Sequence, residues 1–207
     1  MRTKSVIVVL VAMVALSGCV TANSTSTGVD ASGRRAFLSY AGSDTPVYLT
    51  AVNPEFGSPK DVARSVAASA DQSVLGSPVT FTSEWADTKL PQYRIVALFD
   101  PEVSVSTGQV CGSDQTPPVA ARYQDRTNLF MAFCSRGEEI AGARVSGKKL
   151  SGPDDPELDR MVKAGMSEMF PPRGGGDRGN PPVFGSLGFD GGVPKFRLNP
   201  LAGIVGD

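Results

Sequence analysis

The first 19 residues constrain this chain most, because they determine the compartment in which the remainder folds. Two positive charges lie in Met1-Arg2-Thr3-Lys4, an unbroken apolar run of 11 residues spans Val6–Leu16, and small residues follow. That order is the pattern of a secretory signal peptide. A bilayer span needs about 20 apolar residues, so the run is too short for a membrane helix. We therefore expect residues 1–18 to be removed after export.

The end of that segment carries a more specific signal. Leu16-Ser17-Gly18-Cys19 resembles the lipobox of bacterial lipoproteins, in which the cysteine is acylated and becomes the first mature residue. The resemblance implies lipid attachment at Cys19, and two acyl groups give stable membrane attachment. Val20 stands where an aspartate would signal inner-membrane retention in many lipoproteins, so we expect the outer membrane, facing the periplasm. An uncleaved anchor and an ordinary secreted protein are the alternatives.

Two cysteines remain if Cys19 carries lipid. Cys111 and Cys134 are then an even pair in an oxidising compartment, where a disulfide is the expected state. Metal binding by the two thiolates is the alternative, but the sequence offers them no obvious partner ligands.

Histidine is absent from the whole sequence, which excludes much familiar chemistry. Imidazole is the usual catalytic base and the commonest zinc ligand, so Ser-His-Asp and Cys-His catalysis are impossible here. Lys and Arg total 20 against 21 Asp and Glu, and this balance offers no basic stripe for nucleic acid. We expect no catalytic residues, no metal, no cofactor and no nucleic-acid partner.

Strands are predicted where β-branched and aromatic residues gather, at 46–52, 79–82, 93–99, 128–134 and 139–145. The strand at 93–99 has one charge, Arg94, and should be covered on both faces. The last two strands are separated by Arg136-Gly137 and should form an antiparallel hairpin. Residues 102–126 show no clean period and are expected to form a long loop.

Two amphipathic helices are predicted from apolar residues at a 3.6-residue period. One begins at Ser58-Pro59 and ends before Gly76, and the other covers 156–170 with Asp155 as its cap. The expected fold is α+β, an antiparallel sheet of four or five strands with two helices packed on one face.

A single domain is expected over residues 37–172. Residues 19–36 are small, polar and without periodicity, so we expect a flexible tether. From Pro171 to Asp207, 16 of 37 residues are Gly or Pro, which predicts a mostly disordered tail over 173–207. The tail nevertheless contains Phe184, Phe189 and Phe196, so it could bind the domain or an envelope partner instead of being a mobile spacer.

Three short motifs resemble functional sites but lack the required context. Residues 142–149 come within one residue of a phosphate-binding loop, but lie in and just past a hairpin strand. Gly174, Gly176 and Gly179 fit a dinucleotide pattern but follow a helix. Ser146 and Lys149 have the spacing of a serine–lysine nucleophile, without the companion motifs.

Four segments in residues 90–172 look like those of uncharacterised proteobacterial cell-envelope lipoproteins. They are Tyr93–Pro101, Ala132-Phe133-Cys134, Gly152-Pro153-Asp154-Asp155-Pro156 and Phe170-Pro171-Pro172. The resemblance implies envelope localisation and the Cys111–Cys134 disulfide, and it implies no activity.

The expected function is a non-catalytic assembly or interaction module, anchored to the membrane by its lipid. A small-ligand-binding lipoprotein that uses the loop around Cys111 is the alternative. A histidine-free hydrolase that uses Ser and Lys, or paired carboxylates, is a third possibility.

Overall fold

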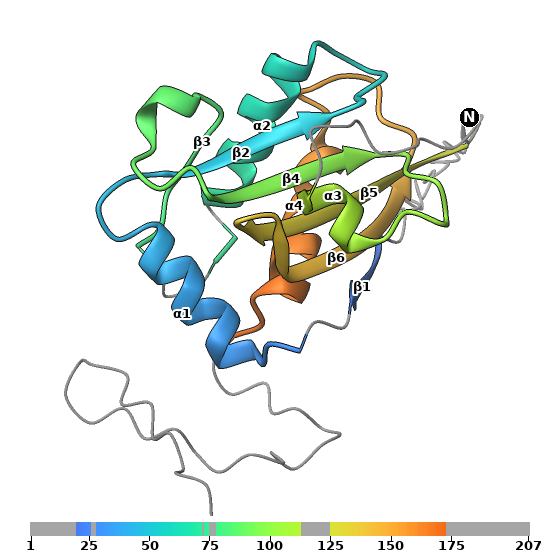
Figure 1. The fold of residues 1–207 in the computed structure, drawn as a ribbon. Coiled ribbons are helices and arrows are strands. Elements are labelled where there is room, and N and C mark those ends of the chain that lie inside the picture. Colours follow the sequence, from blue (N-terminus) through green and yellow to red (C-terminus); the bar gives the residue numbers. More distant parts are fainter. Residues whose placement is uncertain (1–19, 26–27, 72, 75–77, 113–124, 173–207) are drawn as a thin grey trace, which may run out of the picture. The chain divides into compact units, whose positions relative to one another are not determined.

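A computed structural model describes residues 20–25, 28–71, 73–74, 78–112 and 125–172 (Figure 1). Cys19, the expected signal peptide and the tail from residue 173 lie outside the described residues. The compact unit that contains the described residues ends at Pro172. Within the part of the chain that is described, no helix is long and apolar enough to cross a membrane.

One mixed sheet of six strands organises the fold, in the order β1-β6-β5-β4-β2-β3. The strands are β1 (Thr21–Thr25), β2 (Val47–Val52), β3 (Phe81–Thr82), β4 (Tyr93–Phe99), β5 (Arg126–Ser135) and β6 (Glu138–Lys148). The pairs β1–β6, β6–β5 and β5–β4 are antiparallel, whereas β2 runs parallel to both β4 and β3.

The α+β class is confirmed, but the expectation of a purely antiparallel sheet of four or five strands is wrong. After β2 the chain passes through α2 (Pro59–Asp71) and returns to the end of the sheet where β2 began, before β4 starts. A crossover of this kind makes the two strands parallel. β1 adds a further strand at one edge.

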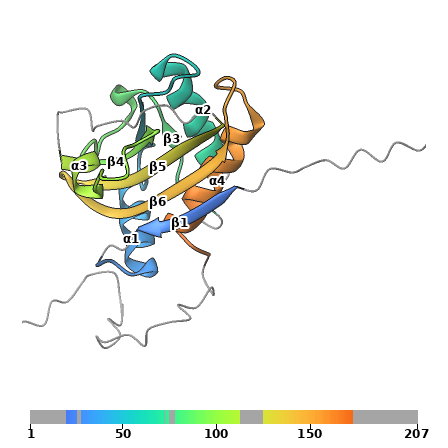
Figure 2. The same ribbon diagram turned by 90° about the vertical axis from the view of Figure 1, so that its right-hand side faces the viewer.

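Helices cover the two faces of the sheet unequally (Figure 2). On one face α2 packs beside α4 (Pro156–Met169), and α1 (Ala31–Ala41) contributes Leu38 and Ala41 to the same core. On the opposite face lies α3 (Thr107–Gly112), a short helix inside the segment predicted to be a loop. A single 3₁₀ turn, η1 (Trp85–Asp87), lies between β3 and β4.

β4 is the central strand, and it is buried on both faces as predicted. Ile95, Ala97 and Phe99 join the core under α2 and α4, whereas Val96 and Leu98 join the smaller core under α3. Successive side chains of a strand point to opposite faces, so an uninterrupted apolar run requires cover on both.

The hairpin predicted from two runs of apolar residues is confirmed as β5 and β6. Arg136 and Gly137 form its turn with φ angles of 50° and 88°. Glycine adopts such left-handed angles without the steric penalty that a Cβ atom imposes.

The prediction of a flexible tether over residues 19–36 is wrong for the residues that the structure describes. Thr21–Thr25 forms β1 and pairs antiparallel with β6, from Thr21 opposite Ser146 to Thr25 opposite Gly142. The folded domain therefore begins at about Val20 instead of residue 37. An edge strand is held to its neighbour by backbone hydrogen bonds, so its solvent-exposed side chains can all be polar.

Helix α1 also occupies part of the predicted tether. The Asp30 side chain accepts a hydrogen bond of 2.7 Å from the Gly33 amide, which is an N-cap. The same hydrogen bond holds the pKa of Asp30 below its usual value, with a further contribution from the Ser32 hydroxyl.

Helix α4 begins as predicted, with Asp155 as its cap and Pro156 at the first position. Asp155 accepts hydrogen bonds from the amides of Glu157 at 2.9 Å and Ser151 at 3.0 Å. These bonds lower the pKa of Asp155.

Replacing Asp155 with alanine is expected to destabilise the fold by about 1 kcal/mol, because two backbone amides lose their acceptor. The exposed neighbour Asp154 is the matched control, and its alanine variant should change the free energy of unfolding far less. Urea denaturation at pH 7 measures both, and equal losses would contradict the capping role. Since the pKa of Asp155 is lowered, its contribution is present above about pH 3.8 and is lost as pH falls through the lowered value.

Candidate functional site

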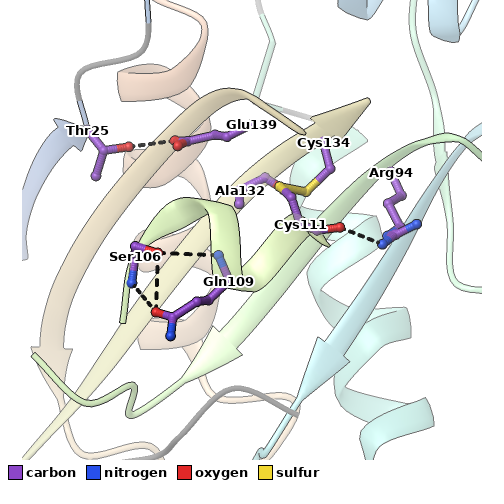
Figure 3. The surroundings of a disulfide bond; sticks show 8 residues. All are labelled: Thr25, Arg94, Ser106, Gln109, Cys111, Ala132, Cys134 and Glu139. Carbon is purple, nitrogen blue, oxygen red and sulfur yellow. Dashed lines mark hydrogen bonds between the residues drawn. A yellow bond between two sulfur atoms is a disulfide. The ribbon is translucent and has the colours of Figure 1, made fainter. Parts of the chain in front are cut away.

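The disulfide predicted between Cys111 and Cys134 is present (Figure 3). Their Cα atoms are 5.4 Å apart, within the normal range for a bridge. Both residues are buried, and the bond joins α3 to β5. Neither sulfur is a free thiolate, so the alternative of metal binding by this pair does not fit the structure.

The bridge holds α3 against the sheet face opposite α2 and α4. Val105 and Val110 pack with Phe130 in the same small core. The Arg94 guanidinium donates a hydrogen bond of 3.0 Å to the carbonyl of Cys111. Helix, bridge and arginine therefore form one structural clamp.

Beside this clamp lies a hollow of about 180 Å³, between β1, β5, β6 and the segment after β4. Its lining combines apolar side chains with hydroxyl and amide side chains, among them Thr21, Asn23 and Ser146. The lining residues are Thr21, Asn23, Pro101, Val103, Asn128, Leu129, Phe130, Arg144, Val145 and Ser146. The hollow is smaller than the roughly 300 Å³ at which small-molecule pockets usually begin.

Arg144 is the one charged residue of that lining, and it is held in place. Its guanidinium donates a hydrogen bond of 2.8 Å to the carbonyl of Val105. It also lies 5.0 Å from the centre of the Phe130 ring, within the range of a cation–π contact. A fixed guanidinium beside neutral donors suits a small anion, such as a carboxylate or phosphate group.

Asp100 directly follows β4 and is a buried carboxylate. The next residue, Pro101, lines the hollow. The Asp100 amide donates to the carbonyl of Asn128, and the Asp100 carboxylate accepts from the Asn128 amide, both at 2.8 Å. Burial raises the pKa of Asp100, opposed by the hydrogen bond from Asn128, while Glu55 raises it further. These contacts end the β4–β5 ladder, so a structural role accounts for the carboxylate.

Two substitutions separate this structural role from a chemical one. Asp100→Asn keeps the acceptor for Asn128 and removes a buried charge, so it should match or exceed wild-type stability at pH 7. Asp100→Ala should lose about 1–3 kcal/mol, because the Asn128 amide loses its acceptor. Its φ of 47° adds to that loss, since asparagine and aspartate tolerate this region better than alanine.

The pH dependence of the same variants has a defined sign. Because the pKa is raised in the folded chain, the contribution of Asp100 to stability is present below about pH 3.8 and is lost as pH rises through the raised value. Asp100→Asn should therefore gain stability relative to wild type between acid and neutral pH. Thermal unfolding across that range measures the difference, and a relative loss would contradict this account.

Where the remaining sequence motifs fall on described residues, they are not assembled into a reactive site. Glu138 and Glu139 are neighbours on β6, so their side chains point to opposite faces of the sheet. The Glu139 carboxylate accepts a hydrogen bond of 2.8 Å from the Thr25 hydroxyl (Figure 3). Ser146 lies on β6 beside the hollow, whereas Lys149 lies beyond the end of the strand. Gly174, Gly176 and Gly179 lie outside the described residues. Among the residues that are described, no three His, Cys, Asp or Glu side chains could together hold a metal ion.

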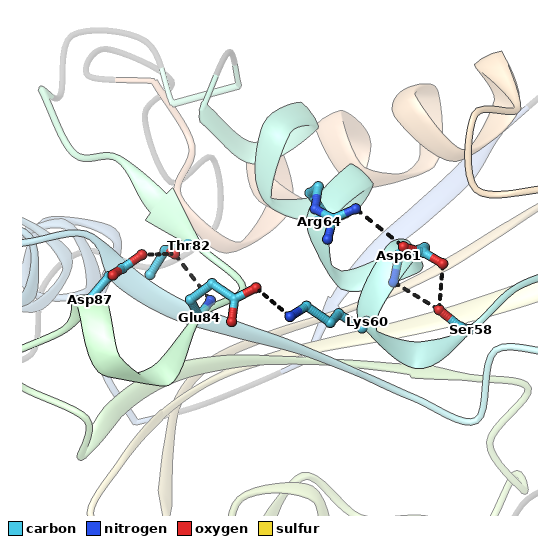
Figure 4. A network of polar contacts seen from close by, with 7 residues as sticks. All are labelled: Ser58, Lys60, Asp61, Arg64, Thr82, Glu84 and Asp87. Atoms are coloured by element: carbon cyan, nitrogen blue, oxygen red, sulfur yellow. Dashed lines mark hydrogen bonds and ion pairs between the residues drawn. The ribbon is translucent and has the colours of Figure 1, made fainter.

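A second polar cluster links α2 to η1 (Figure 4). Lys60 pairs with Glu84 at 3.0 Å, and at least half of each side chain is exposed. Ser58 caps α2 by accepting a hydrogen bond from the Asp61 amide and donating one to its carboxylate, which lowers the pKa of Asp61. Exposed pairs of this kind contribute little to stability, and the cluster encloses no reactive group.

Two exposed aromatic side chains lie at the end of the sheet where β4 begins. Tyr40 of α1 packs edge-on against Tyr93, and Trp85 of η1 packs edge-on against Tyr48. Tyr40 and Trp85 are 59% and 54% exposed. Large exposed aromatics are typical of protein–protein contacts, and sequence periodicity did not single out either residue.

Comparison with known proteins gives no family and no activity for this chain. No family model matches it, and no curated protein matches it. A search of solved structures finds a likeness to a point variant of the PelC dodecamer from Paraburkholderia phytofirmans, at 8% identity. The match covers 73% of this chain and 95% of the other, with a TM-score of 0.34. A likeness at this level carries no argument about fold or function.

Proposed function

We propose that this protein is a cell-envelope lipoprotein, anchored by an acylated Cys19 and acting as a non-catalytic assembly or interaction module. The observation that carries the proposal is the junction between anchor and domain. The segment Leu16-Ser17-Gly18-Cys19 resembles a lipobox, and only Val20 separates it from β1. Such a chain would place a folded domain directly on a membrane, most simply the outer membrane facing the periplasm.

Two features support a non-catalytic role. The sequence contains no histidine, so the usual general base is missing. The carboxylate with a raised pKa, Asp100, is bonded to the backbone of Asn128. A catalytic site often holds an acid and a base whose pKa values are shifted in opposite directions. The described residues bring no such pair together.

Partner contact is the activity that remains for such a module. Tyr40 and Trp85 offer exposed aromatic surface on the domain. The tail from residue 173 adds apolar residues at intervals, among them Phe184 and Phe196. We propose an envelope protein as the partner, with the tail as the capturing segment.

Crosslinking in intact membranes, followed by purification of the lipidated protein, tests this proposal. A chain truncated after Pro172 should remain in the membrane and unfold at the same temperature, but should lose the crosslinked partner. Capture at the wild-type level by the truncated chain would contradict the role of the tail. A double variant, Tyr40→Ser and Trp85→Ser, then shows whether the domain itself makes the contact.

The hollow beside Arg144 favours a second candidate, a lipoprotein that binds a small anion. Arg144→Gln removes the charge and keeps hydrogen-bond donors, so it should abolish any stabilisation by phosphate or short carboxylates. Thermal unfolding with and without these anions measures the effect. Stabilisation of the wild type alone would support this candidate over the interaction module.

A further inference from the structure

The short link between Cys19 and β1 restricts how the domain can lie on a membrane, provided that the proposed acylation of Cys19 holds. Only Val20 separates Cys19 from Thr21, and successive Cα atoms are about 3.8 Å apart. The Cα atom of Cys19 therefore lies within about 8 Å of that of Thr21. Because β1 is paired along its length with β6, the link keeps the end of the sheet that contains Thr21 close to the lipid.

The strand register identifies the residues that share an end of the sheet with Thr21. Thr21 pairs with Ser146 of β6, which pairs in turn with Asn128 of β5. Arg126 and Lys148 pair with each other two residues further out on the same two strands. We call this the Thr21 end of the sheet.

Val103 lies at the Thr21 end and is unusually exposed for an apolar residue. It lines the same hollow as Thr21 and Ser146. Its exposed fraction is 80%, the highest of any exposed large apolar side chain among the described residues. Neither core includes Val103, so packing within the domain does not explain an apolar side chain at this position.

We infer that the Thr21 end rests on the phospholipid surface that holds the acyl chains, with Val103 inserted where headgroups meet the acyl region. An apolar side chain gains free energy by leaving water at such a boundary. The short link favours the lipid surface as the binding partner of the Thr21 end, because the proposed lipid attachment lies immediately before β1.

Charge makes a smaller contribution to this contact. The Thr21 end carries charges of both signs: the exposed cations are Arg126, Lys148 and Lys149, and the exposed carboxylates are Glu55, Glu102 and Asp125. Charges of both signs give no net attraction to an anionic surface. The orientation should therefore be the same on neutral and anionic lipid.

The opposite end of the sheet then faces the aqueous compartment. Trp85 packs on Tyr48, which lies in register with Arg94 near the start of β4. Five residue-to-residue steps along β4 lead from Arg94 to Phe99 at the Thr21 end, a distance of about 17 Å. Trp85 is the one tryptophan of the chain, so it provides a natural probe of the end held away from the lipid.

Tryptophan quenching by brominated lipid tests this orientation. The lipidated full-length protein is reconstituted in vesicles whose phosphatidylcholine carries bromine near the headgroup, with and without phosphatidylglycerol. The near probe is Val103→Trp in a Trp85→Phe background, and the wild type with Trp85 is the matched far probe. Ser104→Trp in the same background is a second near probe, in case the first disturbs the loop.

The near probes should be quenched equally in both kinds of vesicle, and Trp85 should not be quenched. Quenching of Trp85 alone, or of neither end, would overturn the orientation. Quenching that requires phosphatidylglycerol would overturn the apolar contact through Val103. Flotation of the vesicles separates the two proposals: protein that fails to float refutes the anchor and this inference together, whereas floating protein with unquenched near probes refutes this inference alone.

Discussion

Replacing Cys19 with serine is expected to move the protein from the membrane fraction to the aqueous fraction. Each acyl methylene buried in the bilayer contributes about 0.8 kcal/mol, and two chains give stable attachment. Serine offers no thiol for acylation. Ultracentrifugation of lysed cells, with detection of the protein in each fraction, measures the change.

The matched control removes the other two cysteines and keeps Cys19. The double variant Cys111→Ser and Cys134→Ser should remain in the membrane fraction, because it keeps the proposed acylation site, Cys19. If Cys19→Ser also remained there, the apolar run Val6–Leu16 would be acting as an uncleaved anchor, and the lipid attachment would be refuted.

Loss of the Cys111–Cys134 disulfide is expected to produce the second large effect, a destabilisation of about 3 kcal/mol. The bond closes a loop with a sequence separation of 23, and removing it restores conformational entropy to the unfolded chain. The double alanine variant avoids a lone thiol, and urea denaturation measures the loss. The size of the effect follows from loop length, so it does not depend on any activity.

The damage should be concentrated at α3. This helix contacts β4, β5 and β6 from one side through a small core, whereas α4 packs in the larger core on the opposite face. Hydrogen exchange should accelerate in Thr107–Gly112 far more than in Pro156–Met169. Equal acceleration of hydrogen exchange in both helices would show that the disulfide stabilises the whole domain, and not α3 in particular.

Strong apolar patterns made the centre of the fold predictable. β4 and α4 were predicted at nearly their observed bounds, because burial on two faces or on one helical stripe imposes a regular pattern. The Asp155 cap and the β5–β6 turn could also be predicted, because residues close in sequence determine their hydrogen bonds and φ angles.

The N-terminal elements were missed because only a few of their residues are apolar. The sequence of β1, TANST, has no alternating apolar pattern, and its pairing with β6 depends on backbone atoms. Helix α1 buries only Leu38 and Ala41. Its one local signal was Asp30, a capping residue three positions before Gly33.

The parallel pairing and the hollow depend on tertiary arrangement. The order strand, helix, strand over residues 47–99 could have suggested a parallel crossover, but polarity patterns alone do not fix strand order. The hollow combines residues from four separate segments, from Thr21 to Ser146. Of the expected sites, only the disulfide could be checked against described residues, because Cys19 lies outside them.

The intact mass of the mature protein, extracted from membranes in detergent, tests the anchor most directly. This account predicts a polypeptide that begins at Cys19 and carries the added mass of a diacylglyceryl group, with or without a further acyl chain. Digestion should place that mass on the N-terminal peptide. A mature protein with the mass of the bare polypeptide, or one that still begins at Met1, would contradict the account.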